Sequence, residues 1–200
     1  MAESEKDLLN RYLRKARREL VAKLDGLSER DVRWPMTGTG TNLLGLVKHV
    51  ASIEIGYFGE TFGRPGPELP WYADGADANA DMWATEDESR EQILALQAEA
   101  ERLTEATIEE LDLDAVGTVA WWGERGAVTL RTVMIHVSFE ISRHAGHADI
   151  VRELIDNRAG NDDGNLPELD AATWATYRQR LEMAAEKAAE NAADSKEGPF

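Results

Sequence analysis

All four histidines of the sequence fall in two segments with helical periodicity: His49 in one, and His136, His144 and His147 in the other. On a wheel of about 100° per residue, His144 lies within roughly 20° of four aliphatic residues, at the centre of the apolar face. These four are Val133, Val137, Val151 and Ile155. Glu140 precedes His144 by one turn and lies about 40° away. The sequence therefore places a carboxylate beside an imidazole on a face predicted to be buried.

Glu140 and His144 have a spacing suited to sharing one cation. An ionised carboxylate on an apolar face is costly unless it is paired or bound to a metal. Positions i and i+4 of a helix share one face and lie about 6 Å apart along the axis. His136 and His144 lie about 12 Å apart, too far to join the same ion. A third ligand must then come from another helix, where His49 is the only histidine.

The surroundings of His49 support this choice. The apolar arc of its helix begins about 40° to one side of it. The small residues Gly45, Ser52 and Gly56 lie on the other side and leave space for a close helix approach or for a ligand cavity. We therefore predict a metal site made by His49, Glu140 and His144. A Glu140–His144 ion pair without a metal is the alternative, and spacing alone gives the two equal weight.

Five further residues are candidates for the surroundings of this site. They are His136, His147, Arg143, Trp121 and Trp122. His147 and His136 lie about 60° and 80° from His144, which favours a supporting role on the flank over ligation. Arg143 could hold an anionic substrate, although a surface ion pair is the commoner role of such a residue. The two tryptophans could line a substrate pocket or cap one end of the fold. No catalytic residue separate from the metal site is predicted.

Helical periodicity accounts for most of the chain. The predicted long helices are 6–25, 41–62, 85–111, 129–157 and one that begins near Asp170. Thr41 and Thr129 are predicted N-caps, and Thr85 with Glu88 predicts a capping box. Residues 116–126 predict a short hairpin or an irregular loop. The pattern predicts an all-α protein, a four-helix bundle with long inter-helix loops and an extra C-terminal helix.

Domain organisation follows from the same pattern. We expect residues 1–160 to form the bundle. Residues 161–200 are expected to be a helical extension of the same domain, with a tail that frays from about Ala189.

Composition excludes several classes of function. The 200 residues include 22 Lys and Arg against 38 Asp and Glu, a formal charge of −16, which argues against nucleic-acid and anionic-membrane partners. The chain has no cysteine, which excludes disulfides, thiolate ligands and a cysteine nucleophile. No apolar run approaches the roughly 18 residues of a membrane span, and the polar N-terminus is unlike a signal peptide. A cytoplasmic location is therefore expected.

Two stretches carry a resemblance to a known family. Residues 43–54 read LLGLVKHVASIE, and residues 136–150 read HVSFEISRHAGHADI, preceded by Thr129-Leu130-Arg131. With these, the chain from its first helix to about Gly160 resembles the DinB-like superfamily, which includes mycothiol-dependent maleylpyruvate isomerases. The Trp121-Trp122-Gly123 stretch and the His-x-Gly-His-x-Asp pattern resemble its uncharacterised actinobacterial branch.

The resemblance implies an up-down-down-up four-helix bundle with one divalent metal, usually zinc or nickel. The family holds this metal with one histidine of the second long helix and two residues one turn apart on the fourth. Isomerase-like members use His, Glu and His, which correspond here to His49, Glu140 and His144. The wheels and the resemblance therefore select the same three residues.

The resemblance also implies a function, a divalent-metal-dependent enzyme acting on a small molecule. It would be a thiol-dependent transferase or isomerase, with mycothiol as a candidate cosubstrate, or a hydrolase. The alternative is a non-catalytic bundle, metal-stabilised or ligand-binding, with a role in stress. A homodimer is expected, because the family often pairs through helix faces and the C-terminal helix bears Trp174 and Tyr177 as extra apolar surface.

Overall fold

The computed structural model describes residues 3–160 and 167–194. The chain forms two compact units, Met1–Asn161 and Asp162–Phe200. The long helices of the first unit are α1 (Glu5–Ala22), α3 (Leu43–Glu54), α4 (Arg90–Glu110) and α5 (Leu130–Asp156). The second unit contains α6 (Ala171–Asp194). The predicted all-α bundle is confirmed.

The sequence predicts more than this division into two units, namely that residues 161–200 extend the same domain as the bundle. That part stays a prediction. The predicted fraying from about Ala189 falls partly on residues 195–200, outside the described part of the chain.

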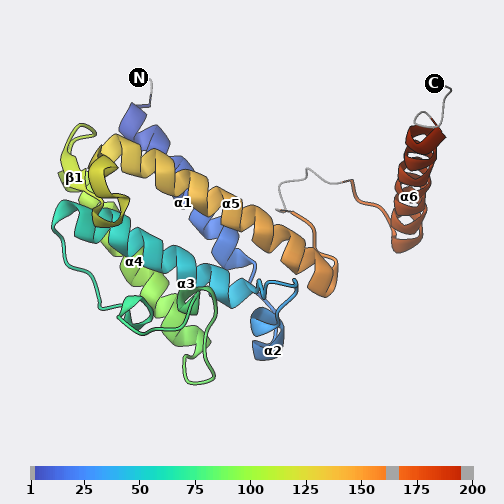
Figure 1. Ribbon diagram of the computed structural model, residues 1–200, viewed down its shortest axis with the longest axis horizontal. Helices are drawn as coiled ribbons and strands as arrows, with labels where there is room; N and C mark the ends of the chain where they lie inside the picture. The colour runs from blue at the N-terminus through green and yellow to red at the C-terminus, as the bar shows by residue number, and fades with distance from the viewer. Residues whose placement is uncertain (1–2, 161–166, 195–200) are drawn as a thin grey trace. The chain divides into compact units, whose positions relative to one another are not determined.

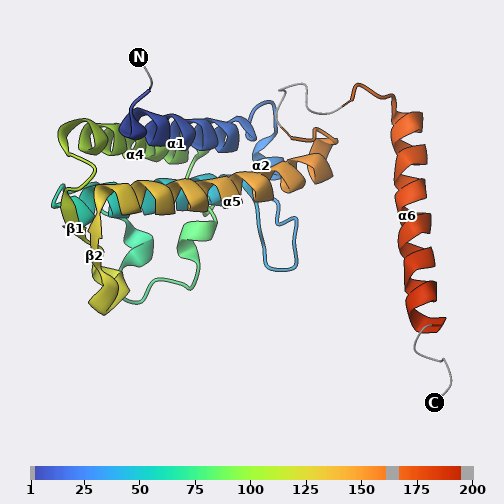
Figure 2. The same ribbon diagram turned by 90° about the horizontal axis from the view of Figure 1, so that it is seen from above.

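The four long helices of the first unit pack in two layers (Figure 1). Helices α3 and α5 form one layer, and α1 and α4 form the other (Figure 2). The colour gradient shows that α1 and α5 run in one direction and α3 and α4 in the opposite one, which is the up-down-down-up order. In Figure 2 the long loops lie on the side of the α3/α5 layer that faces away from α1 and α4.

The core lies between these helices. Its fully buried members share an aliphatic character and come from each layer: Leu13 and Leu20 of α1, Leu46 and Val50 of α3, and Val133, Val137 and Ile141 of α5. Burying such side chains contributes about 1.5–3 kcal/mol each to stability. The predicted apolar face of α5 is thus the face that packs into the bundle.

The helix that carries His49 differs from the prediction at both ends. Its N-cap is Asn42, not Thr41, because the Asn42 Oδ1 accepts a hydrogen bond from the Gly45 N–H at 2.8 Å. The α-helix ends at Glu54 and continues as a π-helical turn over Ile55–Gly59 and a 3₁₀ turn over Glu60–Phe62. Such π turns occur often at functional sites.

The predicted start of α4 is also wrong. The helix begins after Ser89, which forms a capping box with Gln92. Glu88 accepts a hydrogen bond from the Thr85 N–H at 2.8 Å, as predicted, but its carboxylate is also bound by Lys48 Nζ at 2.9 Å. The earlier turn therefore anchors a loop to α3 instead of starting the helix.

The remaining elements are short. They are α2 (Glu29–Arg33), the 3₁₀ turns η3 (Pro70–Tyr72), η4 (Ala80–Met82) and η5 (Ala120–Arg125), and the strands β1 (Val116–Thr118) and β2 (Ala127–Thr129). The two strands pair antiparallel, with Val116 opposite Thr129, and η5 lies between them. Residues 116–129 therefore form a hairpin, one of the two forms predicted.

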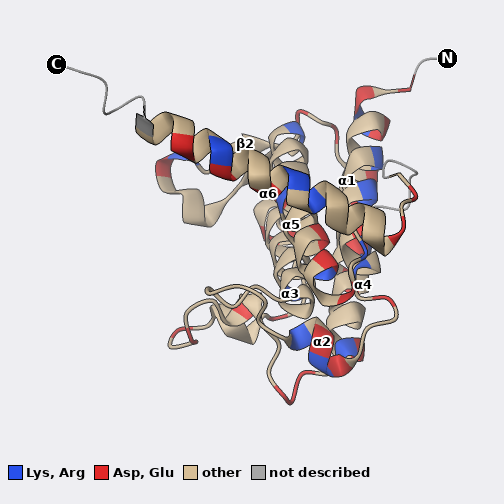
Figure 3. Cartoon of the chain, turned by 90° about the vertical axis from the view of Figure 1, so that its right-hand side faces the viewer, with Lys and Arg blue, Asp and Glu red and all other residues tan. Residues whose placement is uncertain are grey.

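Acidic and basic residues both occur along α1 and α2 (Figure 3). Several of these charges are paired: Arg33 lies 3.1 Å from Glu29, and Arg14 bonds Glu105 of α4. Within the described residues, no helix is both long enough and apolar enough to cross a bilayer.

Candidate metal centre

His144 lies on α5 beside the core, as its wheel position predicts. Its side chain is only 13% exposed, and its Nδ1 is buried without a hydrogen-bond partner among the described residues. Burial, and after it the nearby His49, His147 and Arg143, together lower the pKa of His144 to about 4. The imidazole is therefore neutral at pH 7, the form that binds a metal.

Glu140 lies one turn before His144 on the same helix. Its Oε2 is 3.7 Å from the His144 Nε2, and its side chain is 29% exposed. This separation is longer than a hydrogen bond, so the two groups are neighbours that are not bonded to each other. The side of the pair that carries Glu140 is the more open to solvent.

His49 reaches the same place from α3. Its ring contacts the His144 ring edge to face, with centroids 4.7 Å apart. Its Nδ1 is hydrogen-bonded to the Asp81 Oδ2 at 2.6 Å, and the Tyr72 hydroxyl donates to the same oxygen at 3.2 Å. The hydrogen bond from His49 lowers the pKa of Asp81. Beside an ionised Asp81, the neutral form of His49 carries its proton on Nδ1 and has its lone pair on Nε2.

The loop that carries Asp81 is fastened along α3. Lys48, which is buried, donates from Nζ to the carbonyls of Ala80 at 2.9 Å and Trp83 at 3.0 Å. Its ammonium also lies 4.1 Å from the centroid of the Trp71 ring, whose Nε1 donates to Ser52 Oγ at 3.0 Å. These contacts hold the loop on both sides of Asp81.

The small residues beside His49 therefore serve neither of the two predicted roles, a close helix approach or a ligand cavity. A Cβ at Gly45 would lie 1.8 Å from the Met82 carbonyl oxygen, so the loop touches the helix there. A Cβ at Gly56 would lie 3.1 Å from the Trp121 ring. Neither a helix nor an open cavity occupies this side, because the two loops do.

His144 lies beside each of the other two predicted ligands, His49 and Glu140. The described residues nevertheless contain no group of three His, Asp or Glu side chains placed to hold a metal ion. The donor set fits a divalent cation in its chemistry. It offers a neutral imidazole whose Nε2 faces a carboxylate and whose other nitrogen, Nδ1, is buried without a partner among the described residues, and a second imidazole whose Nδ1 is held by a carboxylate. A carboxylate behind a ligating histidine is the usual arrangement at metal sites.

A second cluster lies next to this one. The Tyr57 hydroxyl of the π turn is 3.0 Å from the His136 Nε2, and the Trp121 Nε1 donates to the same hydroxyl at 3.4 Å. Trp122 packs edge to face against His136, with centroids 4.9 Å apart. Trp122 also lines a cavity at the hairpin, whereas Trp121 is absent from that lining.

The other two candidates lie at the surface of α5. His147 is exposed, and its ring centroid is 5.6 Å from that of His144. Arg143 is exposed as well, with its guanidinium 5.6 Å from the Phe139 ring centroid. Neither side chain lies in the buried part of the site.

Sequence reasoning missed Asp81, and it did not predict the hydrogen bonds that Tyr72 and Tyr57 make at the two clusters. Asp81 and Tyr72 stand in the long connection between α3 and α4, where no periodicity applies, and the aspartate meets a histidine 32 positions earlier. The one available signal was the unusual length of that connection, which is typical of functional loops.

Comparison with known proteins agrees with the fold. The sequence model of the family described as mycothiol S-transferase matches residues 8–157. A crystal structure of a conserved protein from Enterococcus faecalis is similar with a TM-score of 0.55 at 14% identity, over 77% of this chain and 98% of that one. This likeness concerns the fold alone. No curated protein matches the chain. Because the family model covers the whole bundle from α1 to α5, the chain belongs to the mycothiol S-transferase family, within the DinB-like superfamily.

Proposed function

We propose that the protein is a metal-dependent enzyme that joins mycothiol to a small-molecule substrate, with His49, Glu140 and His144 as the ligands of one divalent cation, zinc or nickel. The observation that supports the proposal is the position of His144, which contacts His49 of α3 and lies 3.7 Å from Glu140 of its own helix. Family membership supports the thiol as cosubstrate. A bound divalent cation supplies Lewis acidity, which favours the thiolate form of a thiol at neutral pH.

The chain's own residues provide the conditions for this chemistry. His144 stays neutral at pH 7 because it is buried, so its nitrogens keep a lone pair without competition from a proton. Asp81 holds the ring of His49 in one orientation. Glu140 adds the negative charge that offsets part of the charge of a cation, and its partial exposure leaves a side for the substrate.

Metal content tests the ligand assignment. The full chain, purified with and without added Zn²⁺ or Ni²⁺, is analysed by elemental analysis beside His144→Ala and His147→Ala. We expect about one ion per wild-type chain, loss of that ion in His144→Ala and retention in His147→Ala, since His147 is exposed on the same helix. Full stoichiometry in His144→Ala would show that the ligands are elsewhere.

Thiol dependence tests the reaction. The metal-loaded chain is incubated with an electrophile and mycothiol, and consumption of the free thiol is followed against a metal-free sample. We expect consumption only with metal and mycothiol together. A chain that binds the metal but leaves the thiol unreacted across a panel of electrophiles would instead be the non-catalytic metal-stabilised bundle.

Two coarser proposals accompany this one. We place the protein in the cytoplasm, where a low-molecular-weight thiol is found. We also propose a homodimer, because Tyr177, Leu181 and Met183 of α6 are each about half exposed. Sedimentation at micromolar concentration checks the dimer, and a strictly monomeric 22.2 kDa species would exclude it.

A further inference from the structure

A cavity of about 630 Å³ lies at the hairpin end of the bundle, within the size range of small-molecule sites. It is bounded by β1, η5, β2 and the first turn of α5. Its lining is Val116, Trp122, Arg125, Ala127, Val128, Thr129 and Thr132. The metal-centre residues do not belong to it, so its occupant has not been considered above.

The lining has a distinct chemistry. It contains one large aromatic ring, one guanidinium and two hydroxyls, and no carboxylate, in a chain where 38 of 200 residues are acidic. Arg125 is exposed and makes no hydrogen bond or ion pair within the described part of the chain, so its five donors are free for a ligand. A neutral molecule rich in hydroxyl groups suits a ring face beside free donors.

Residues of one helix, α5, contribute both to the cavity and to the candidate metal centre. Thr132, His136 and Glu140 are successive turns of α5, so the cavity wall at Thr132 is about 12 Å along the axis from Glu140. Trp122 belongs to both places, since it lines the cavity and packs against His136 at 4.9 Å. A ligand seated against Trp122 is thus one small-molecule length from the candidate ligands.

We propose that this cavity binds the sugar part of the thiol cosubstrate, a glucosamine joined to an inositol. The inference rests on the proposed function. Trp122 packs against a ring of the pseudodisaccharide, while Arg125 and the Thr132 hydroxyl bond its hydroxyl groups. The cysteinyl end then extends past His136 towards Glu140 and His144. This cavity therefore selects mycothiol over smaller thiols.

Direct binding of the thiol-free, neutral pseudodisaccharide, N-acetylglucosaminyl-inositol, tests the cavity without any reaction. Isothermal titration calorimetry on the full chain should show saturable binding. Arg125→Ala and Trp122→Ala should weaken it by about tenfold or more, because aromatic and charged anchors dominate such contacts. Trp122→Phe keeps a ring and should restore much of the affinity. Arg18→Ala, at an exposed arginine of α1, is the matched control and should bind as wild type does.

A comparison of two thiols separates this proposal from the proposed function. For Arg125→Ala, the ratio of KM for mycothiol to KM for N-acetylcysteine should rise by about tenfold. Thiol transfer without any saturable sugar binding would overturn the cavity assignment and leave the function standing. Sugar binding that depends on Trp122 and Arg125, in a chain with no transfer activity, would support the cavity and overturn the function. Equal sugar affinity in wild type, Arg125→Ala and Trp122→Ala would also overturn the assignment.

Discussion

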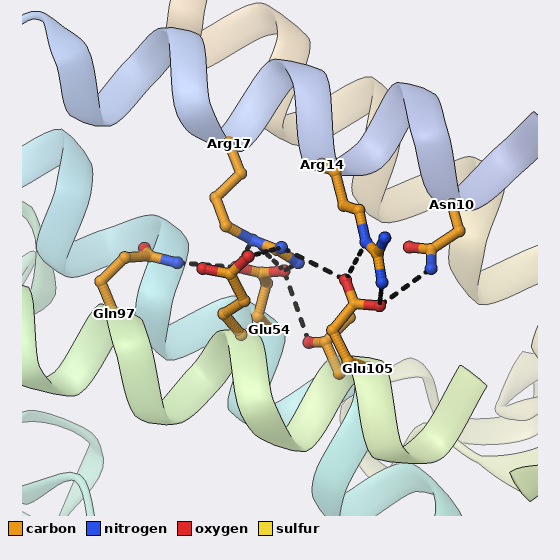
Figure 4. Close-up of polar contacts among 8 residues, drawn as sticks. Asn10, Arg14, Arg17, Glu54, Gln97 and Glu105 are labelled. Carbon is orange, nitrogen blue, oxygen red and sulfur yellow. Dashed lines mark hydrogen bonds and ion pairs between the residues drawn. The ribbon is translucent and has the colours of Figure 1, made fainter. Parts of the chain in front are cut away.

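Two polar clusters on different faces of α3 are built in opposite ways. Glu54 and His49 are five residues apart, so they point about 140° from each other. Glu54 points between α1 and α4, where its carboxylate accepts hydrogen bonds from Arg17 and Gln97 (Figure 4). His49 points towards α5 and meets His144, whose buried Nδ1 has no partner among the described residues.

The difference lies in how the charged groups are paired, since each cluster contains buried polar atoms without a hydrogen-bond partner among the described residues. The side chains of Arg17 and Glu54 are 2% and 0% exposed, and the Arg17 Nε lies 3.1 Å from each carboxylate oxygen. The Arg17 Nη1 forms ion pairs with Glu101 at 3.1 Å and Glu105 at 3.6 Å, although without hydrogen-bond geometry. A buried charge pair of this kind, closed to solvent, acts to hold helices together. The cluster at His144 instead sets a neutral imidazole beside a partly exposed carboxylate, so it is the one suited to a ligand.

Breaking the closed cluster should have the largest effect on stability. Glu54→Ala removes the main partner of a buried guanidinium, which we expect to lower the free energy of unfolding by about 3–5 kcal/mol. Urea denaturation measures this change. Metal content should stay at the wild-type level in the folded fraction, because Glu54 faces away from His49.

The double variant Arg17→Met/Glu54→Leu is the control. It removes both charges and fills their volume with apolar atoms, so it should recover most of the stability lost in Glu54→Ala. A loss of metal in Glu54→Ala with little change in stability would show that the two clusters are not separate in function.

Acidification should lower the free energy of unfolding through the cluster at His144, by a somewhat smaller amount than Glu54→Ala does. An unfolded histidine titrates near 6.5, whereas burial lowers the pKa of His144 to about 4. Between these pH values the unfolded chain binds more protons than the folded one, so the free energy of unfolding falls as the pH falls. The contribution of His144 is about 3 kcal/mol, lost between pH 6.5 and 4 and constant above pH 6.5.

Chelator-treated protein shows this effect without competition from a metal. Urea denaturation from pH 7.5 to 4 is compared between wild type and His144→Gln, which cannot titrate. The free energy of unfolding of the variant should fall less over this range, by about the amount assigned to His144. Parallel curves for the two proteins would show that His144 takes up a proton as readily in the folded state as in the unfolded one.

The two clusters also differ in how far the sequence reveals them. Helix α5 follows one uninterrupted period, from the Thr129 cap to Asn157, which ends it in the left-handed conformation at φ 61°. Its inward face could therefore be predicted residue by residue, and Glu140 and His144 with it. Asp81 could not be predicted, because its role depends on a fold-back of a loop onto His49.

The start of α4 was mispredicted because two similar capping motifs lie close together and a tertiary contact determines which one begins the helix. Thr85 with Glu88 and Ser89 with Gln92 both have capping-box spacing, and Lys48 decides between them by binding the Glu88 carboxylate. The π turn after Glu54 is likewise invisible to a 3.6-residue period. Threonine hydroxyls from outside the turn donate hydrogen bonds to some of its carbonyls. One is Thr107 of α4, which donates to the Phe58 carbonyl at 2.9 Å.

The smallest expected effect concerns Asp81, whose contact with His49 could not be predicted from the sequence. Asp81→Asn removes the charge that fixes the proton of His49 on Nδ1 and keeps the size of the side chain. If His49 ligates the cation, affinity for Zn²⁺ should fall about 10–100-fold, as it does when the carboxylate behind a ligating histidine is lost. Competition with a chromophoric chelator measures the affinity, and ¹⁵N NMR of the metal-free protein reports which nitrogen of His49 is protonated. Asp74→Asn is the matched control, because Asp74 is exposed in the same loop and should leave both readouts at their wild-type values. Equal affinities of the two variants, together with an unchanged His49 tautomer, would place Asp81 among the contacts that only hold the loop. The cluster at His49 would then serve, like the one around Glu54, to hold parts of the fold together.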